Sequence, residues 1–206
     1  MKKAIQLFPT VTGICILLCS CAARRAQETG FLSDYSKLKA QSNVSARYLA
    51  PGNIAARYSK FIIDPVEIYL HAGSKAKGKL KDEDIADLKN YMHEALVKAI
   101  EDRYEIVYRP GPGVARVRVA ITDLKRSRIV QNIWPVSKAI GTGLGGASLE
   151  AEIIDSVTGE QIGAVVESQL GNRLSLDGLS TWGDVKAIMD GWAKRFRTRL
   201  DEAHGR

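Results

Sequence analysis

Cysteine is scarce in this chain of 206 residues, and all three cysteines lie near its beginning, at Cys15, Cys19 and Cys21. Beyond residue 21 the chain therefore has no thiol for a disulfide, for nucleophilic catalysis or for a cysteine-ligated metal. A domain without cross-links must be stable through its apolar core alone. The roughly 185 residues that remain are enough to bury such a core.

Other catalytic and cofactor patterns are also missing. The three histidines, His71, His93 and His204, do not pair at the spacing of a metal site. No serine lies in a G-x-S-x-G turn, so nothing indicates the nucleophile of a hydrolase. We therefore expect no metal, no cofactor and no enzymatic activity.

The glycine-rich stretch at residues 141–146 matches G-x-G-x-x-G in form only. A dinucleotide site needs a strand before this motif and a helix after it, whereas here a strand is predicted to follow. A closely packed or flexible loop is the default interpretation. The alternative is a loop that contacts a partner through Gly141, Gly143, Gly145 and Gly146.

The N-terminus has the pattern of a secretory signal peptide. Lys2 and Lys3 precede an interrupted apolar run over residues 4–18. This run is shorter than the roughly 20 apolar residues of a membrane span. The pattern predicts a signal peptide over residues 1–20, and the alternative is an uncleaved anchor helix.

Residues 18–21, Leu18, Cys19, Ser20 and Cys21, resemble the lipobox of bacterial lipoproteins. The resemblance implies cleavage before Cys21 and lipidation of its thiol. Two or more acyl chains on one residue anchor a protein stably. Ala22 follows, where Asp would imply retention in the inner membrane. In a Gram-negative host, the resemblance therefore implies anchoring in the outer membrane. We expect the domain to face the periplasm, and the alternative is exposure at the cell surface.

Without Lys2 and Lys3 the chain keeps 28 Lys and Arg against 23 Asp and Glu, a net charge of +5. A periplasmic protein does not meet nucleic acid. Its anionic partners are lipid headgroups, lipopolysaccharide and peptidoglycan carboxylates, and the alternative is ordinary solubility charge. A basic loop at residues 71–81, with Lys75, Lys77 and Lys79, is a candidate contact.

The remaining chain predicts a tether at 21–30, an irregular arm at 31–59 that packs on the domain through its aromatic residues, and an α+β domain at 60–206. Strands are expected at 60–70, 104–108, 114–130, 147–155 and 161–170, with Pro65 marking an edge or a bulge. A helix follows Asp82, since apolar residues recur at helical spacing up to Ile100. A second helix is expected at 181–203, with Thr181 as its N-cap and Asp184 answering it.

The expected strands carry polar side chains on one face only, so only the other face is buried. The pattern predicts a two-layer α+β sandwich, a mainly antiparallel sheet of about five strands with two long helices on one face. The opposite face is expected to be solvated or to meet a partner. Glu150, Glu152 and Glu167 could cluster there as paired carboxylates that cleave glycosidic bonds, or form ion pairs with Arg116 and Arg118.

Four short motifs occur along the chain: GFLSDYSKL at 30–38, YLAP at 48–51, IDPV at 63–66 and DSVTG at 155–159. Their order resembles an uncharacterised family of Gram-negative lipoproteins, a DUF3313-like domain of unknown function. The resemblance covers nearly the whole chain after Cys21. It implies a lipoprotein domain and supplies no activity.

The order of helices and strands is also similar to domains of periplasmic assembly lipoproteins, such as the curli secretion lipoprotein and the lipoprotein activators of peptidoglycan synthases. We expect a non-enzymatic interaction or assembly module that binds an envelope protein or peptidoglycan. The alternatives are an oligomeric scaffold or secretion pore and, third, a glycan- or peptidoglycan-acting enzyme.

Overall fold

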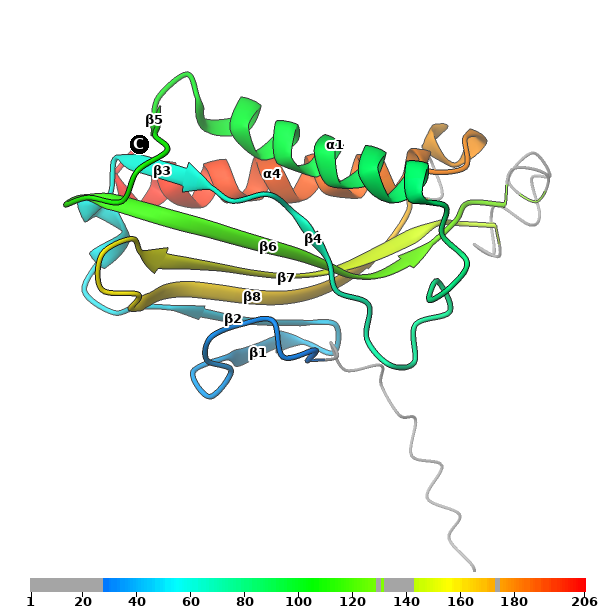
Figure 1. The fold of residues 1–206 in the computed structure, drawn as a ribbon, viewed down its shortest axis with the longest axis horizontal. Helices are drawn as coiled ribbons and strands as arrows, with labels where there is room; N and C mark the ends of the chain where they lie inside the picture. The colour runs from blue at the N-terminus through cyan, green and yellow to red at the C-terminus, as the bar shows by residue number, and fades with distance from the viewer. Residues whose placement is uncertain (1–27, 129–130, 132–142, 173–174) are drawn as a thin grey trace, which may run out of the picture.

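The computed structural model describes residues 28–128, 131, 143–172 and 175–206. These residues form a mixed α+β fold with two long helices and eight strands (Figure 1). The strands are β1 Lys39–Ser42, β2 Ser45–Leu49, β3 Lys60–Ile63, β4 Glu67–Ile68, β5 Glu105–Ile106, β6 Val114–Lys125, β7 Gly146–Asp155 and β8 Gln161–Leu170. The helices are α1 Asp82–Ile100 and α4 Gly183–Ala203, with short 3-10 turns η1 Ile54–Arg57 and η2 Asp177–Leu179.

The strands form one sheet in the order β1-β2-β8-β7-β6-β3-β5, and β4 also pairs with β6. The ladder from β1 to β6 is antiparallel, whereas β3 and β4 run parallel to β6 and β5 runs parallel to β3. The prediction of a mainly antiparallel sheet is confirmed.

The predicted number of strands, about five, is wrong for two reasons. The arm at 31–59 contains the hairpin β1–β2, whose short, polar sequences KAQS and SARYL show no clear alternation. Pro65 also interrupts the strand expected at 60–70, because proline cannot donate to the ladder, and the segment pairs as two pieces, β3 and β4.

Both long helices cover the same face of the sheet (Figure 1). The core between the layers holds Leu88 of α1, Ile121 of β6 and Met189 of α4, each with 0% of its surface exposed. The repeat of apolar residues that predicted α1 gives its buried stripe of Leu88, Met92, Leu96 and Ile100. No helix in the described ranges is long and apolar enough to cross a membrane.

The predicted start of the second helix is wrong. The helix begins at Gly183, its N-cap residue is Trp182, and no side chain caps it. Asp184 does not form a capping box with Thr181. Its buried carboxylate accepts hydrogen bonds from Ser127 Oγ at 2.8 Å and from the Gly145 N–H at 2.7 Å, so it joins the end of β6 to the start of β7.

The face opposite the helices is covered by residues 29–38, which we call the strap. Phe31 and Leu32 of the strap pack with Ala120, Ala164 and Val166 of the sheet in a second, smaller core. The expectation that this face is solvated or meets a partner is therefore wrong over its centre, because the chain covers it with its own N-terminal arm.

Candidate functional site

The strap is fastened to two glutamates that are almost fully buried, Glu150 at 0% and Glu152 at 1% exposed. Glu150 accepts hydrogen bonds from the Thr29 N–H at 2.7 Å and from the Tyr35 hydroxyl. Glu152 accepts the N–H and the hydroxyl of Ser33, at 3.0 and 2.7 Å. A buried carboxylate needs such donors, so the strap and the glutamates depend on each other.

Arg118 and Tyr35 complete the electrostatics of this face. Arg118 forms an ion pair with Glu152, which confirms the cross-strand pairing considered from the sequence. Burial, together with the hydrogen bond to Glu150, raises the pKa of the Tyr35 phenol, so it stays a hydrogen-bond donor. Arg116 pairs instead with Asp64, at 3.6 Å.

The proposed cluster of three carboxylates does not form. Glu167 is one residue after Val166, and Val166 pairs in register with Glu150. Because side chains alternate along a strand, Glu167 lies on the helix side of the sheet. There it binds Arg195 of α4 at 2.7 Å.

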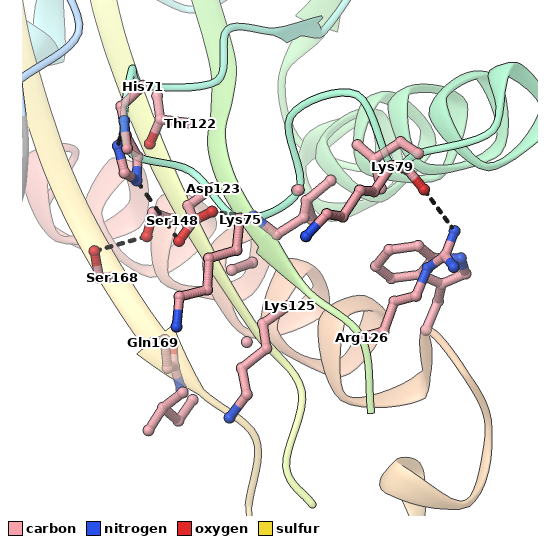
Figure 2. A pocket seen from close by; sticks show the side chains of 18 of the residues that line it. His71, Lys75, Lys79, Thr122, Asp123, Lys125, Arg126, Ser148, Ser168 and Gln169 are labelled. Carbon is pink, nitrogen blue, oxygen red and sulfur yellow. Dashed lines mark hydrogen bonds and ion pairs between the residues drawn. The ribbon is translucent and has the colours of Figure 1, made fainter. Parts of the chain in front are cut away.

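A basic groove of about 710 Å³ opens where β6 ends, β7 begins and β8 ends, beneath the loop at 71–81 (Figure 2). Its lining includes His71, the five cations Lys75, Lys79, Lys125, Arg126 and Arg128, and one carboxylate, Asp123. Five positive charges against one negative leave a net charge of +4 on the lining when His71 is neutral.

Asp123 fastens the loop to β6. Its Oδ1 accepts the Ser74 hydroxyl at 2.6 Å, and its Oδ2 lies 3.7 Å from His71 Nε2. The His71 N–H also donates to the Thr122 carbonyl oxygen at 3.1 Å, which continues the ladder beyond β4. These contacts hold the loop against β6 and place its lysines over the strand ends.

The cations of the groove differ in how they are held. Arg126 pairs with Asp84 at 2.8 Å and lies over the ring of Trp182, 5.1 Å from its centre. Within the described residues, the ammonium groups of Lys75 and Lys79 form no ion pair or hydrogen bond. Figure 2 shows the Lys75 side chain extending from the loop over the strand ends. These two lysines are the groove's adaptable anion contacts.

The floor of the groove offers neutral hydrogen-bonding groups. Ser148 of β7 and Ser168 of β8 pair in register, and their hydroxyls are 2.7 Å apart. Thr122 and Gln169 lie on the same lining, while Val44 and Leu170 supply apolar surface at its rim. The arrangement suits an anion that also carries hydroxyl or amide groups.

Of the partner-binding residues predicted from the sequence, Lys75, Lys79 and Gly146 line the groove, whereas Lys77 and Gly145 do not. Gly141 lies outside the described residues, and Gly143 accepts the Arg128 N–H through its carbonyl oxygen at 2.8 Å. A Cβ at Gly145 would come within 2.7 Å of Ser127 Oγ, so this glycine is needed for close packing.

Sequence reasoning missed Lys125, Arg126 and Arg128, which line the groove from the end of β6. They were assigned to a strand expected to run to residue 130, whereas β6 ends at Lys125. The run of three cations in four residues was the available signal. No group of three or more His, Cys, Asp or Glu that could hold a metal occurs in the described part of the chain.

No curated protein matches the sequence. Among solved structures, the PelC dodecamer from Paraburkholderia phytofirmans is 13% identical with a TM-score of 0.41, over 73% of this chain and 96% of that one. A neuraminyllactose-binding hemagglutinin homolog from Helicobacter pylori is 10% identical with a TM-score of 0.38, over 72% and 85% of the two chains. A Xanthomonas campestris protein with the DUF330 domain is 10% identical with a TM-score of 0.34, over 69% and 81%.

A family model described as a protein of unknown function, DUF3313, matches residues 27–196. The match begins just before the strap, spans every strand of the sheet and ends within α4. The chain therefore belongs to the DUF3313 family.

Proposed function

We propose that this protein is a lipid-anchored, non-enzymatic interaction module of the outer membrane whose basic groove binds peptidoglycan. The observation that carries the proposal is the groove itself, whose lining combines Lys75 and Lys79 with a floor of hydroxyl and amide groups. Peptidoglycan combines the two chemistries that this lining suits. Its stem peptides carry carboxylates for the lysines, and its glycan carries hydroxyls for the serines.

The position of the strap supports a site close to the membrane. The Thr29 N–H is bonded to Glu150, and Val166, which pairs with Glu150, lines the groove. The eight peptide units from Cys21 to Thr29 span at most about 29 Å. A lipid on Cys21 would therefore hold the groove near the membrane surface.

The proposal is tested by sedimentation with purified peptidoglycan sacculi. The chain from residue 21 onward contains the strap, the sheet and both cores, so it is produced without lipid for this assay. We expect it to pellet with sacculi in low salt and to be released as ionic strength rises, because exposed charges are screened over about 8 Å at physiological salt.

The matched variants reverse equal numbers of charges. Lys75→Glu with Lys79→Glu should abolish pelleting, whereas Lys98→Glu with Lys194→Glu, on exposed positions of α1 and α4, should leave it unchanged. Equal loss in both pairs would mean that net charge alone drives binding. Failure of the unaltered chain to pellet would refute peptidoglycan as the partner and turn attention to an acidic envelope protein.

The anchor is tested separately in cells. Cys21→Ala should prevent lipidation, and the protein should no longer be recovered with outer-membrane vesicles. Two results would contradict the predicted lipid attachment. One is that the unaltered protein takes up no radioactive fatty acid, and the other is that Cys21→Ala is recovered unchanged in the membrane fraction.

A further inference from the structure

A second cavity, which we call the α4 cleft, lies on the helix side of the sheet and shares no lining residue with the basic groove. It has a volume of about 470 Å³, within the usual range for small-molecule sites. It lies between α4 and the strands β8 and β2. Here α4 covers β7 and β8, and the sheet continues beyond the helix to β2.

The walls of the cleft are apolar. Leu49 of β2 is 60% exposed although it is a large aliphatic residue, and the half-buried Phe196 of α4 belongs to the same lining. Gly163 of β8 contributes open space rather than a side chain. A Cβ there would meet only ordinary contacts, 3.5 Å from the Tyr48 carbonyl oxygen and 3.6 Å from Leu49 Cδ1. A glycine within a strand often marks a place where a ligand approaches closely.

Arginines gather at the cleft. Arg47 of β2 and Arg199 of α4 belong to its lining, and within the described residues neither forms an ion pair with a carboxylate. Burial and the charge of Arg47 nearby lower the pKa of Arg199. Three glutamates also belong to the lining, but Glu152 is paired with Arg118 and Glu167 with Arg195, and Glu202 forms no ion pair with Arg47 or Arg199 in the described residues. Arg47 and Arg199 therefore keep charges that can bind an anionic group.

Trp192 adds an unsatisfied donor to the same lining. The residue is 6% exposed, and its buried indole N–H has no acceptor within the described residues. Buried donors are rarely left unpaired, so an oxygen atom from outside the chain would complete this one. Trp192 precedes Phe196 and Arg199 by four and seven residues on α4, so the three share one helix face.

We propose that the α4 cleft binds a single apolar chain that ends in an anionic group, such as a long-chain fatty acid or a monoacyl phospholipid. The chain lies against Leu49, Gly163 and Phe196, and the anionic group is held by Arg47 and Arg199. The proposal does not depend on the basic groove. An apolar wall with one cationic rim fits this amphipathic ligand better than a peptide, whose many backbone groups would stay unpaired against such walls.

The proposal is tested with the chain from residue 21 onward by calorimetric titration with palmitate below its aggregation concentration. We expect one molecule bound per chain. Each methylene removed in a series of shorter fatty acids should weaken binding about fourfold, the equivalent of one buried CH₂. A parallel titration with monoacyl phosphatidylglycerol identifies the headgroup, since the tighter of the two ligands indicates whether the rim prefers a carboxylate or a phosphate.

Two variants locate the ligand. Gly163→Val fills the cleft at a strand position that tolerates a β-branched residue, and it should abolish binding. Arg47→Ala with Arg199→Ala should weaken binding at least tenfold, whereas Lys194→Ala, at an exposed position of α4, should not change it. Circular dichroism and thermal unfolding show whether each variant is folded, and the arginine pair carries the test if Gly163→Val is not.

Three results would overturn the proposal. The first is no binding of either lipid to the unaltered chain. The second is binding that persists unchanged in folded Gly163→Val. The third is equal affinity for a cationic detergent with the same sixteen-carbon chain, because that would remove the arginines from recognition.

Discussion

Tyr35→Phe removes one oxygen atom and should release much of the strap's attachment. The phenol donates to Glu150 and accepts the backbone N–H groups of Gly30 at 2.9 Å and Leu32 at 3.0 Å. A hydrogen bond to a charged group contributes about 1.5–3 kcal/mol and a neutral one about 0.5–1.5 kcal/mol. Since the Gly30 bond is exposed to water, we expect a loss of about 2–4 kcal/mol in the free energy of unfolding.

The assay is urea unfolding followed by circular dichroism, with Tyr108→Phe as the matched control. Tyr108 is 91% exposed, so its variant should change the free energy by less than about 0.5 kcal/mol. Amide exchange at Thr29 and Ser33, whose N–H groups bind the buried glutamates, reports on the strap alone. A loss below about 1 kcal/mol in Tyr35→Phe, with unchanged exchange at both amides, would refute the reasoning.

Three further predictions concern the fold. Leu88→Ala should cost about 2–5 kcal/mol in urea unfolding, because the side chain is fully buried in the core. Gly145→Ala should lower the melting temperature, since its Cβ would meet Ser127 Oγ at 2.7 Å, whereas Gly191→Ala should raise it, because that Cβ fits the helix. Burial and a hydrogen bond to Asp155 raise the pKa of Tyr58 to about 12, above its value of 10 in the unfolded chain. Between these pH values the phenol is therefore protonated in the folded state and ionised in the unfolded state. Stability should therefore fall from pH 10 to 12, and less so in Tyr58→Phe; equal slopes in the two proteins would contradict this.

The helix layer could be predicted from the sequence because its signal is local. The apolar residues of α1 recur every three or four positions, and those that recur became its buried stripe. The turn between β7 and β8 is also local, since Gly159 has a positive φ of 74°, which glycine adopts readily. Both features depend on neighbours in the chain.

The arm at 31–59 was expected to pack on the domain, but the face that the strap covers and the residues that it binds could not be predicted in this way. Its attachment joins residues more than a hundred positions apart, such as Ser33 and Glu152, and neither has a pattern of its own. Polar alternation in β7 correctly placed Glu150 and Glu152 on one face. It gave no sign that a segment without regular structure would cover that face, because a strand facing water and a strand facing a polar strap have the same sequence period.

The residues of the candidate site also fall into those with a local sequence pattern and those whose role depends on packing. Lys75 and Lys79 were found because they repeat within one loop, and the glycines because they form one motif. Arg126 and Arg128 were overlooked because their role depends on where β6 ends, and strand ends are set by packing more than by composition.

The strap gives the two faces of the sheet different tasks. It covers the centre of one face, and the basic groove opens on that face where the strand ends meet the loop at 71–81. On the other face, the two helices cover the apolar surface of the sheet except beside α4, where the sheet is wider than the helix layer and the α4 cleft opens. A basic site and an apolar site therefore lie on opposite sides of one sheet, and a change in either should leave the other intact. Binding of sacculi by Gly163→Val, and of palmitate by the Lys75 and Lys79 charge-reversal variant, would establish that independence, whereas loss of both functions in either variant would show that the sites are coupled through β8.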